Sequence, residues 1–312
     1  MLVTVVFFGS SEFSLSALKA CIDAPFKILR VITTPDRKKG RGLKEAATPV
    51  RRFAEESGLA VSAPETLKTG DLIEEVRALN PELFVVSSYG KIIPSAWLKI
   101  PSRYALNVHP SLLPKYRGAA PLNWPVLNGD SETALSIAEV TDKLDAGDIF
   151  YQKKLPILDS DDSQILSQKL AALSYHALKE IFAKLQKGDS LARTAQDETA
   201  STYARKLEKE DGLVDWNQSA KEIWNRVRGL LPWPAAYFNF QTEPVQILKA
   251  YLEPETDHKA PGTILRISKE GPAAIQTAQG ILILERLKPA GKKEMSAAEF
   301  LRGRRLAEGN SL

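Results

Sequence analysis

Two hydrogen-bonding residues, one of which can also gain and lose a proton, stand at the end of an apolar stretch. Asn107 and His109 fall in "YALNVHP", residues 104–110, and the chain has only three histidines. Residues i and i+2 of an extended chain point to the same side, so the amide and the imidazole would face one site together. Pro110 cannot continue a strand ladder and would turn the chain outward.

An aspartate-rich turn follows. Asp142, Asp145 and Asp148 recur every three residues in "VTDKLDAGDIF", just before an expected strand. The spacing lacks the alternation and the closing glutamate of a calcium loop, so we expect no metal there. Asp and Gly also favour turns for structural reasons alone. The functional hypothesis is that one of the three carboxylates reaches His109, orients its ring and stabilises its charged form.

An amide, an imidazole and a carboxylate together suit the transfer of an activated carbonyl group. The chain has no GxSxG motif and no other obvious serine or cysteine nucleophile motif, so the attacking group would come from a substrate. It also lacks a Walker A motif, and "FFGSSEF" is not GxGxxG, so neither ATP nor a dinucleotide is indicated. A histidine with a purely structural role is the alternative that these residues leave open.

The elements that must position these residues alternate between strands and helices. Amphipathic segments predict helices at residues 69–80 and 163–185. Apolar runs predict strands at residues 2–8, 26–34, 82–88, 104–110 and 133–140. This alternation predicts an α/β fold, a doubly wound and mostly parallel Rossmann-like sheet. Ligands bind beyond the carboxyl ends of the strands in such sheets, where Asn107 and His109 would lie.

The pattern changes after about residue 187. A helix is predicted at residues 219–230, followed by short apolar runs separated by turn signals. These runs are residues 235–240, 245–252, 261–268, 272–278 and 280–287. They predict a small closed or partly closed β-barrel. We therefore expect a catalytic domain at residues 1–189, a linker at 190–206 and a second domain at 207–312.

The composition is that of an ordinary globular protein. A chain of 312 residues can hold two domains, and its net charge of +4 permits an anionic partner without demanding one. The single cysteine, Cys21, excludes a disulfide framework and is expected in a helix core. No signal peptide is expected, and no apolar stretch approaches the roughly 18 residues that span a bilayer. We expect a cytoplasmic monomer with no membrane partner.

Residues 34–48, "TPDRKKGRGLKEAAT", are expected to form an inserted basic loop. A loop of about 15 residues without secondary structure is uncommon and is often functional. Gly40 and Gly42 would give its backbone freedom. Its cations are Arg37, Lys38, Lys39, Arg41 and Lys44, against Asp36 and Glu45. The loop is either a solvated basic segment or a mobile arm that closes on an anionic substrate.

Several motifs resemble one enzyme family. "HPSLLPKYRGAAP" with "LDAGD" is similar to the signature of the folate-dependent formyltransferases. "PDRKKGRG", "RGLLPWPAA" and "LKPAGKKEMSAAEFLRGRR" resemble the methionyl-tRNA formyltransferases within that superfamily. These members often have Asn-Pro-Trp-Pro-Gly where this chain has residues 231–235, "LPWPA". The resemblance covers nearly the whole chain.

The resemblance implies a reaction and a set of residues. The formyl donor would be 10-formyltetrahydrofolate, and the acceptor the α-amino group of methionine on initiator methionyl-tRNA. The product would be N-formylmethionyl-tRNA for translation initiation, and the second domain would be an OB-like, tRNA-binding barrel. The implied catalytic residues are Asn107, His109 and Asp145. The implied folate contacts are Ser111, Leu112, Leu113 and Pro114, and the implied tRNA contacts are Arg41 and Lys206.

The second domain carries a local excess of positive charge. Residues 286–305 hold seven cations, Arg286, Lys288, Lys292, Lys293, Arg302, Arg304 and Arg305, against Glu294 and Glu299. A charge run is often only a solvated face, but the expected barrel and the resemblance together favour a patch that faces phosphates. The residues expected to contact tRNA there are Lys292, Lys293, Arg304 and Arg305.

Three other functions are compatible with parts of this pattern. A formyltransferase acting on a purine precursor or a nucleotide sugar would share the three catalytic residues, but it would have no use for the basic loop and barrel. A formyl-folate hydrolase would use water as the acceptor. A non-enzymatic RNA-binding protein would keep the barrel and would have no use for the three residues.

Overall fold

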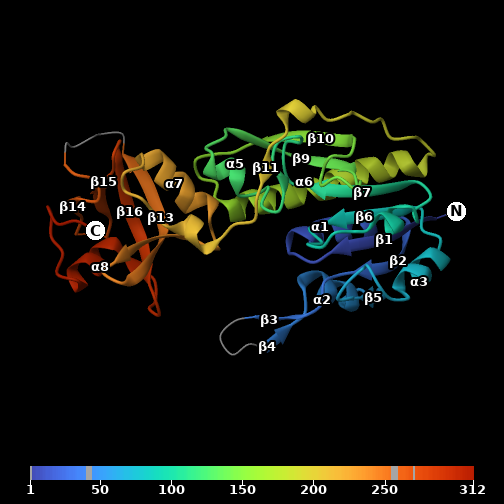
Figure 1. The fold of residues 1–312 in the computed structure, drawn as a ribbon, viewed down its shortest axis with the longest axis horizontal. Coiled ribbons are helices and arrows are strands. Elements are labelled where there is room, and N and C mark those ends of the chain that lie inside the picture. The colour runs from blue at the N-terminus through green and yellow to red at the C-terminus, as the bar shows by residue number, and fades with distance from the viewer. Residues whose placement is uncertain (1, 40–43, 254–258, 270) are drawn as a thin grey trace. The chain divides into compact units, whose positions relative to one another are not determined.

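The computed structural model in Figure 1 describes residues 2–39, 44–253, 259–269 and 271–312. The chain divides into two compact units. Unit 1 comprises residues 1–121, 132–156 and 167–205, and unit 2 comprises residues 122–131, 157–166 and 206–312. Within the described ranges no helix is long and apolar enough to cross a membrane.

Unit 1 is built on a seven-stranded sheet with the strand order β10-β9-β7-β6-β1-β2-β5. Its strands are β1 (Val3–Gly9), β2 (Phe26–Ile32), β5 (Val61–Ser62), β6 (Leu83–Ser87), β7 (Tyr104–His109), β9 (Glu132–Glu139) and β10 (Ile149–Pro156). Strands β5, β2, β1, β6 and β7 run parallel, and β9 and β10 add an antiparallel edge. The expected mostly parallel α/β sheet is confirmed.

Helices lie between these strands along the chain, and the longest of those described here follows β10. They are α1 (Phe13–Ile22), α2 (Pro49–Glu56), α3 (Leu72–Ala78), α4 (Ser95–Leu98), α5 (Trp124–Leu127) and α6 (Ser163–Gln186). The central strand β1 is buried on both faces, as its continuous apolar run predicted. Phe8 packs with Phe84 and Trp97 on one face of the sheet. Cys21 is fully buried in α1, as expected.

The segment expected to be an unstructured basic loop contains a short hairpin. Strand β3 (Arg37–Lys39) pairs antiparallel with β4 (Lys44–Ala46). The expectation of a loop without secondary structure was therefore wrong, because the sequence is too polar to show the apolar alternation by which strands are recognised. Arg41 lies outside the described residues.

The segment interpreted as a linker packs against the rest of unit 1. Strand β11 (Tyr203–Ala204) pairs parallel with β8 (Arg117–Gly118), and Thr194 forms a bridge with Ile149. A 3-10 turn, η1 (Glu198–Ala200), is capped by Asp197. Few of these side chains are apolar, so the packing rests on backbone and side-chain hydrogen bonds, which leave no periodic signal in a sequence.

Unit 2 contains a six-stranded antiparallel sheet with the order β12-β13-β16-β15-β14, to which β17 is added beside β16. The strands are β12 (Ala236–Phe240), β13 (Glu243–Glu253), β14 (Ile264–Ile267), β15 (Ala273–Gln276), β16 (Ile281–Pro289) and β17 (Met295–Ser296). The sheet encloses one apolar core together with α7 (Ala220–Gly229) and α8 (Ala297–Gly303). A 3-10 turn, η2 (Lys209–Gly212), precedes α7 in the chain. A barrel-like domain of antiparallel strands is confirmed.

Two short pieces that precede residue 167, residues 122–131 and 157–166, belong to unit 2. Asn123, just before α5, donates from its side chain to the carbonyl of Gly229 at the end of α7 over 2.7 Å. Arg228 donates to the carbonyl of Asp161 over 2.7 Å, and its guanidinium lies 3.8 Å from the Trp224 ring centroid. Neither piece carries an apolar pattern that would have assigned it to unit 2. In the same unit Ala235 adopts φ +63°, a conformation that favours the glycine expected at this position in similar chains.

Candidate active site

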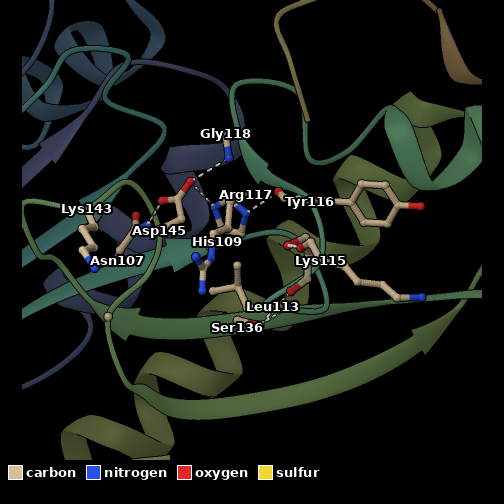
Figure 2. Close-up of polar contacts among 12 residues, drawn as sticks. Asn107, His109, Leu113, Lys115, Tyr116, Arg117, Gly118, Ser136, Lys143 and Asp145 are labelled. Atoms are coloured by element: carbon tan, nitrogen blue, oxygen red, sulfur yellow. Dashed lines mark hydrogen bonds and ion pairs between the residues drawn. The ribbon is translucent and has the colours of Figure 1, made fainter. Parts of the chain in front are cut away.

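The end of β7 brings Asn107 and His109 to the carboxyl edge of the parallel strands. Asn107 pairs in register with Val86 of β6 and Ala138 of β9, and His109 pairs with Ser136 of β9. The His109 side chain is only 5% exposed. The two side chains approach the same carboxylate, as their i, i+2 spacing predicted (Figure 2).

That carboxylate belongs to Asp145. Its Oδ1 accepts from Asn107 Nδ2 over 2.9 Å, and its Oδ2 accepts from the backbone N–H of Gly118 over 2.9 Å and lies 3.6 Å from His109 Nδ1. The other two aspartates of the loop face elsewhere, since Asp142 accepts from Ser95 and Asp148 lies 3.8 Å from Arg193. Of the three aspartates, Asp145 is therefore the one whose carboxylate approaches both Asn107 and His109.

The imidazole of His109 stands between two oxygen acceptors. Its Nε2 lies 3.0 Å from the carbonyl oxygen of Tyr116. A carbonyl only accepts, so Nε2 carries the proton in this contact. Nδ1 faces Asp145 at a distance too long for a hydrogen bond, which leaves that edge of the ring available. Sequence reasoning missed the Tyr116 carbonyl because a backbone group has no residue-type signal.

The loop that carries Asp145 has an unusual backbone. Asp145 adopts φ +50°, in the left-handed region where residues other than glycine are uncommon. Gly147 is buried, and a Cβ there would lie 2.1 Å from the carbonyl oxygen of Glu139. The glycine of "LDAGD" is therefore required by a close backbone approach, and this approach fixes where the loop passes the end of β9.

Polar side chains of β9 and β10 hold the turn that follows β7. Ser136 Oγ donates to the carbonyl of Ser111 over 2.7 Å, and Gln152 Nε2 donates to the carbonyl of Leu113 over 2.9 Å. Ser111 and Leu113 are buried, whereas Leu112 and Pro114 are partly exposed. Of the four residues expected to contact folate, Leu112 and Pro114 present accessible surface, and Ser111 and Leu113 shape the turn.

Hydroxyl groups fasten both ends of the inserted segment. At its start, the backbone N–H of Thr34 donates to Ser10 Oγ, after β1, over 3.1 Å. At its end, Thr48 shares a 2.7 Å hydrogen bond with Thr33 and caps α2. An ion pair of 2.9 Å between Asp36 and Arg51 adds a further restraint. The hairpin therefore emerges from the same carboxyl edge of the sheet as Asn107 and His109.

The residues expected to contact tRNA in unit 2 are on its surface. Lys206, Lys292, Lys293, Arg304 and Arg305 are all exposed. Arg304 pairs with Glu243 over 2.9 Å and lies over the rings of Phe240 and Phe300. An exposed ion pair of this kind contributes little to stability, so its cation remains available to a stronger anionic partner.

Within the described part of the chain, no group of three or more His, Cys, Asp or Glu side chains is arranged to hold a metal ion. The polar groups around His109 are instead engaged with one another.

The chain is similar to known formyltransferases in sequence and in fold. Residues 1–182 match the family model described as formyl transferase, and residues 206–305 match formyl transferase, C-terminal domain. The sugar 3N-formyl transferase WlaRD, solved in the presence of dTDP and 5-N-formyl-THF, has a similar fold. It superposes with a TM-score of 0.69 at 18% identity, over 94% of this chain and 100% of that one.

Two relatives are similar over almost their whole length. The methionyl-tRNA formyltransferase of Thermodesulfovibrio yellowstonii is 40% identical over 98% of this chain and 97% of its own length. That of Dictyoglomus turgidum is 41% identical over 98% of both chains. Both similarities span nearly the whole of this chain. The chain therefore belongs to the formyl transferase family and, within it, to the methionyl-tRNA formyltransferases.

Proposed function

We propose that this protein transfers the formyl group of 10-formyltetrahydrofolate to the α-amino group of methionine on initiator methionyl-tRNA. The observation that carries this proposal is the cluster of Asn107, His109 and Asp145 in a chain that matches methionyl-tRNA formyltransferases from end to end. Asn107 and His109 act on the formyl group, and Asp145 fixes both of them.

The reaction needs an electrophile to be polarised and a proton to be moved. The neutral amine attacks the formyl carbon, and negative charge develops on the formyl oxygen. The bond from that carbon to N10 of the folate then breaks as the amine loses a proton and N10 gains one. The products are the formylated amine and tetrahydrofolate, so atoms and charge balance. Asn107 and His109 stabilise the charge on oxygen, and each such donor is typically worth roughly 2.7–4 kcal/mol.

The contacts of the ring support a specific donor atom. Because Nε2 of His109 is held by the Tyr116 carbonyl, we assign the donor role to Nδ1, which faces Asp145 across 3.6 Å. Donation from Nδ1 as well as from Nε2 requires the doubly protonated ring, because the neutral ring has a single N–H. In this proposal the nearby carboxylate of Asp145 stabilises the charge on the ring while Nδ1–H donates to the formyl oxygen. Passage of the amine proton to N10 through His109 or through water would contribute on the order of 10²–10⁴ in rate.

The folate would lie beside the turn after β7. Leu112 and Pro114 offer partly exposed apolar surface there, in keeping with the apolar lining of small-molecule sites. Ser111 and Leu113 keep the turn in place through Ser136 and Gln152. Asn107 and His109 supply the stabilisation of charge, so the proposal assigns no step to a metal.

The tRNA would be held by the inserted segment and by the surface of unit 2. Arg41, between β3 and β4, is assigned to the acceptor end of the tRNA by resemblance alone. Lys206, Lys292, Lys293, Arg304 and Arg305 are assigned to phosphates, and their exposure supports this assignment. A basic insertion and a second domain have no purpose in a formyl-folate hydrolase, which favours a nucleic-acid acceptor.

An acceptor comparison tests the function directly. The purified protein, supplied with 10-formyltetrahydrofolate, is offered initiator methionyl-tRNA, an amino-sugar nucleotide, a purine precursor amine, or water alone. We expect formylated methionyl-tRNA as the main product, measured by acid-urea gel and mass spectrometry. Preferential formylation of either small amine, or release of formate at the same rate without tRNA, would overturn the assignment.

The three catalytic residues are expected to act as one unit. His109→Ala, Asn107→Ala and Asp145→Ala should each lose most of the transfer rate while folate and tRNA binding persist. The effects of groups that act together are far from additive, so His109→Ala with Asp145→Ala should be little worse than the worse single variant. Single-turnover rates measure this. A multiplicative loss in the double variant would mean that Asp145 works independently of the ring.

Gly147→Ala tests whether the path of the aspartate loop matters for catalysis. The new methyl group would overlap the Glu139 carbonyl, so the loop and Asp145 must shift. A displacement of about 1 Å at a catalytic group can cost about 10²-fold in rate, and we expect a fall in kcat of that order. Gly303→Ala is the matched control, because a Cβ there meets nothing within 4 Å. Equal activity of the two variants would contradict the prediction.

If the basic patch of unit 2 contacts tRNA phosphates, the salt dependence of tRNA binding should depend on its cations. Replacing Lys292, Lys293, Arg304 and Arg305 by Ala should reduce the slope of log K against log salt by about 0.9 for each phosphate that is no longer neutralised. Filter binding or fluorescence anisotropy at several salt concentrations measures the slope. Lys27→Ala with Lys153→Ala, two exposed lysines of unit 1, serves as the control. An unchanged slope in the quadruple variant would show that the patch faces solvent only.

A further inference from the structure

Gln196 lies in the segment expected to be a linker, yet its side chain reaches the aspartate loop. Its Nε2 donates to the carbonyl of Asp145 over 2.9 Å and to the carbonyl of Gly147 over 2.7 Å. Its Oε1 accepts from Arg117 Nη2 over 2.8 Å and from Nε over 3.1 Å. Both N–H groups and both lone pairs of the amide are therefore used.

The orientation of this amide is fixed by its neighbours. Arg117 can only donate, so the amide oxygen must face it, and the NH₂ group must face the two carbonyls. Arg117 is itself held by a two-fold ion pair with Glu198, at 2.9 and 3.0 Å. The hydrogen bonds from Arg117 lower the pKa of Glu198, so this carboxylate keeps its charge at neutral pH.

The two carbonyls that Gln196 binds belong to the most constrained part of the loop. Asp145 has a left-handed backbone, which costs of order 1–3 kcal/mol and persists only when its surroundings hold it. Gln196 donates to the backbone carbonyl of Asp145, while the carboxylate of Asp145 contacts Asn107, Gly118 and His109. The backbone and the side chain of Asp145 are therefore held by different partners.

We propose that Gln196 is a positioning residue for formyl transfer, which holds Asp145 in the conformation that aligns Asn107 and His109. Gln196 touches no reacting atom, and its proposed effect on the reaction is transmitted by Asp145. A glutamate there would keep the pair with Arg117 but would turn a carboxylate toward two carbonyl oxygens. Position 196 therefore requires an amide group, and another side chain of the same size would not replace it. The proposal rests on the proposed catalytic role of Asp145.

The experiment measures formylation of initiator methionyl-tRNA by Gln196→Glu and by Gln196→Met, which fills the space and makes none of the hydrogen bonds. We expect kcat to fall by about 10- to 10²-fold, because the loop is displaced, with little change in the dissociation constant of the folate. Asp197→Ala is the matched control. This neighbour caps η1 and makes no described contact with the aspartate loop, so its kcat should stay within about two-fold of the wild type.

A double-variant cycle separates positioning from general stability. Combining Gln196→Glu with Asp145→Ala should be no slower than Asp145→Ala alone, since the proposed effect of Gln196 on the reaction is transmitted by Asp145. If the losses multiply, or if Gln196→Glu and Gln196→Met both keep normal kcat, the inference is overturned. If Gln196→Glu does not fold, Gln196→Met enters the cycle and the same outcomes decide. Normal activity of Asp145→Ala would instead refute the proposed catalytic set.

Discussion

The carboxylate of Asp145 is the interaction on which the rest of the site depends. One oxygen binds the Asn107 amide, and the other binds the backbone of Gly118 and faces His109. These partners come from the end of β7 and from β8, while Asp145 itself comes from the loop before β10. A single side chain therefore fixes three segments relative to one another. Because charge-assisted hydrogen bonds are stronger than neutral ones, an ionised carboxylate suits this central position.

The part of the site that the sequence predicted is the part that follows local rules. The strand ending at His109 was visible as an apolar run, and the shared direction of Asn107 and His109 follows from the alternation of side chains along a strand. The parallel sheet and the antiparallel second domain were likewise visible as patterns of apolar residues. The choice of Asp145 over Asp142 and Asp148 needed the resemblance to a family, because all three have the same spacing and chemistry. The structure makes the same choice through geometry.

What the sequence did not predict depends on interactions between distant segments. Gln196 lies 51 residues from Asp145 and 79 from Arg117, in a polar stretch with no periodicity. The hydrogen bonds of Ser136 and Gln152 to the turn after β7 could not be predicted either, since a polar residue in a strand is expected to face solvent. The residues 122–131 and 157–166 belong to unit 2 through hydrogen bonds such as that of Asn123 to Gly229. Long-range polar pairing of this kind shapes a fold without marking the sequence.

The hydrogen-bonding capacity of the site supports the proposed reaction, in which the attacking group comes from a substrate and not from the protein. Tyr116 and Asp145 take up Nε2 of His109 and one N–H of Asn107. Within the described residues, the second N–H of Asn107 and Nδ1 of His109 make no hydrogen bond inside the cluster. The Asn107 N–H can donate, Nδ1 can donate when the ring carries its second proton, and both residues lie at the carboxyl edge of β7. Donors held in place before the reaction gain most when negative charge develops beside them, because no reorganisation is then needed. A formyl oxygen that becomes negative during attack by an external amine is such a partner, and a group that must itself attack is not required.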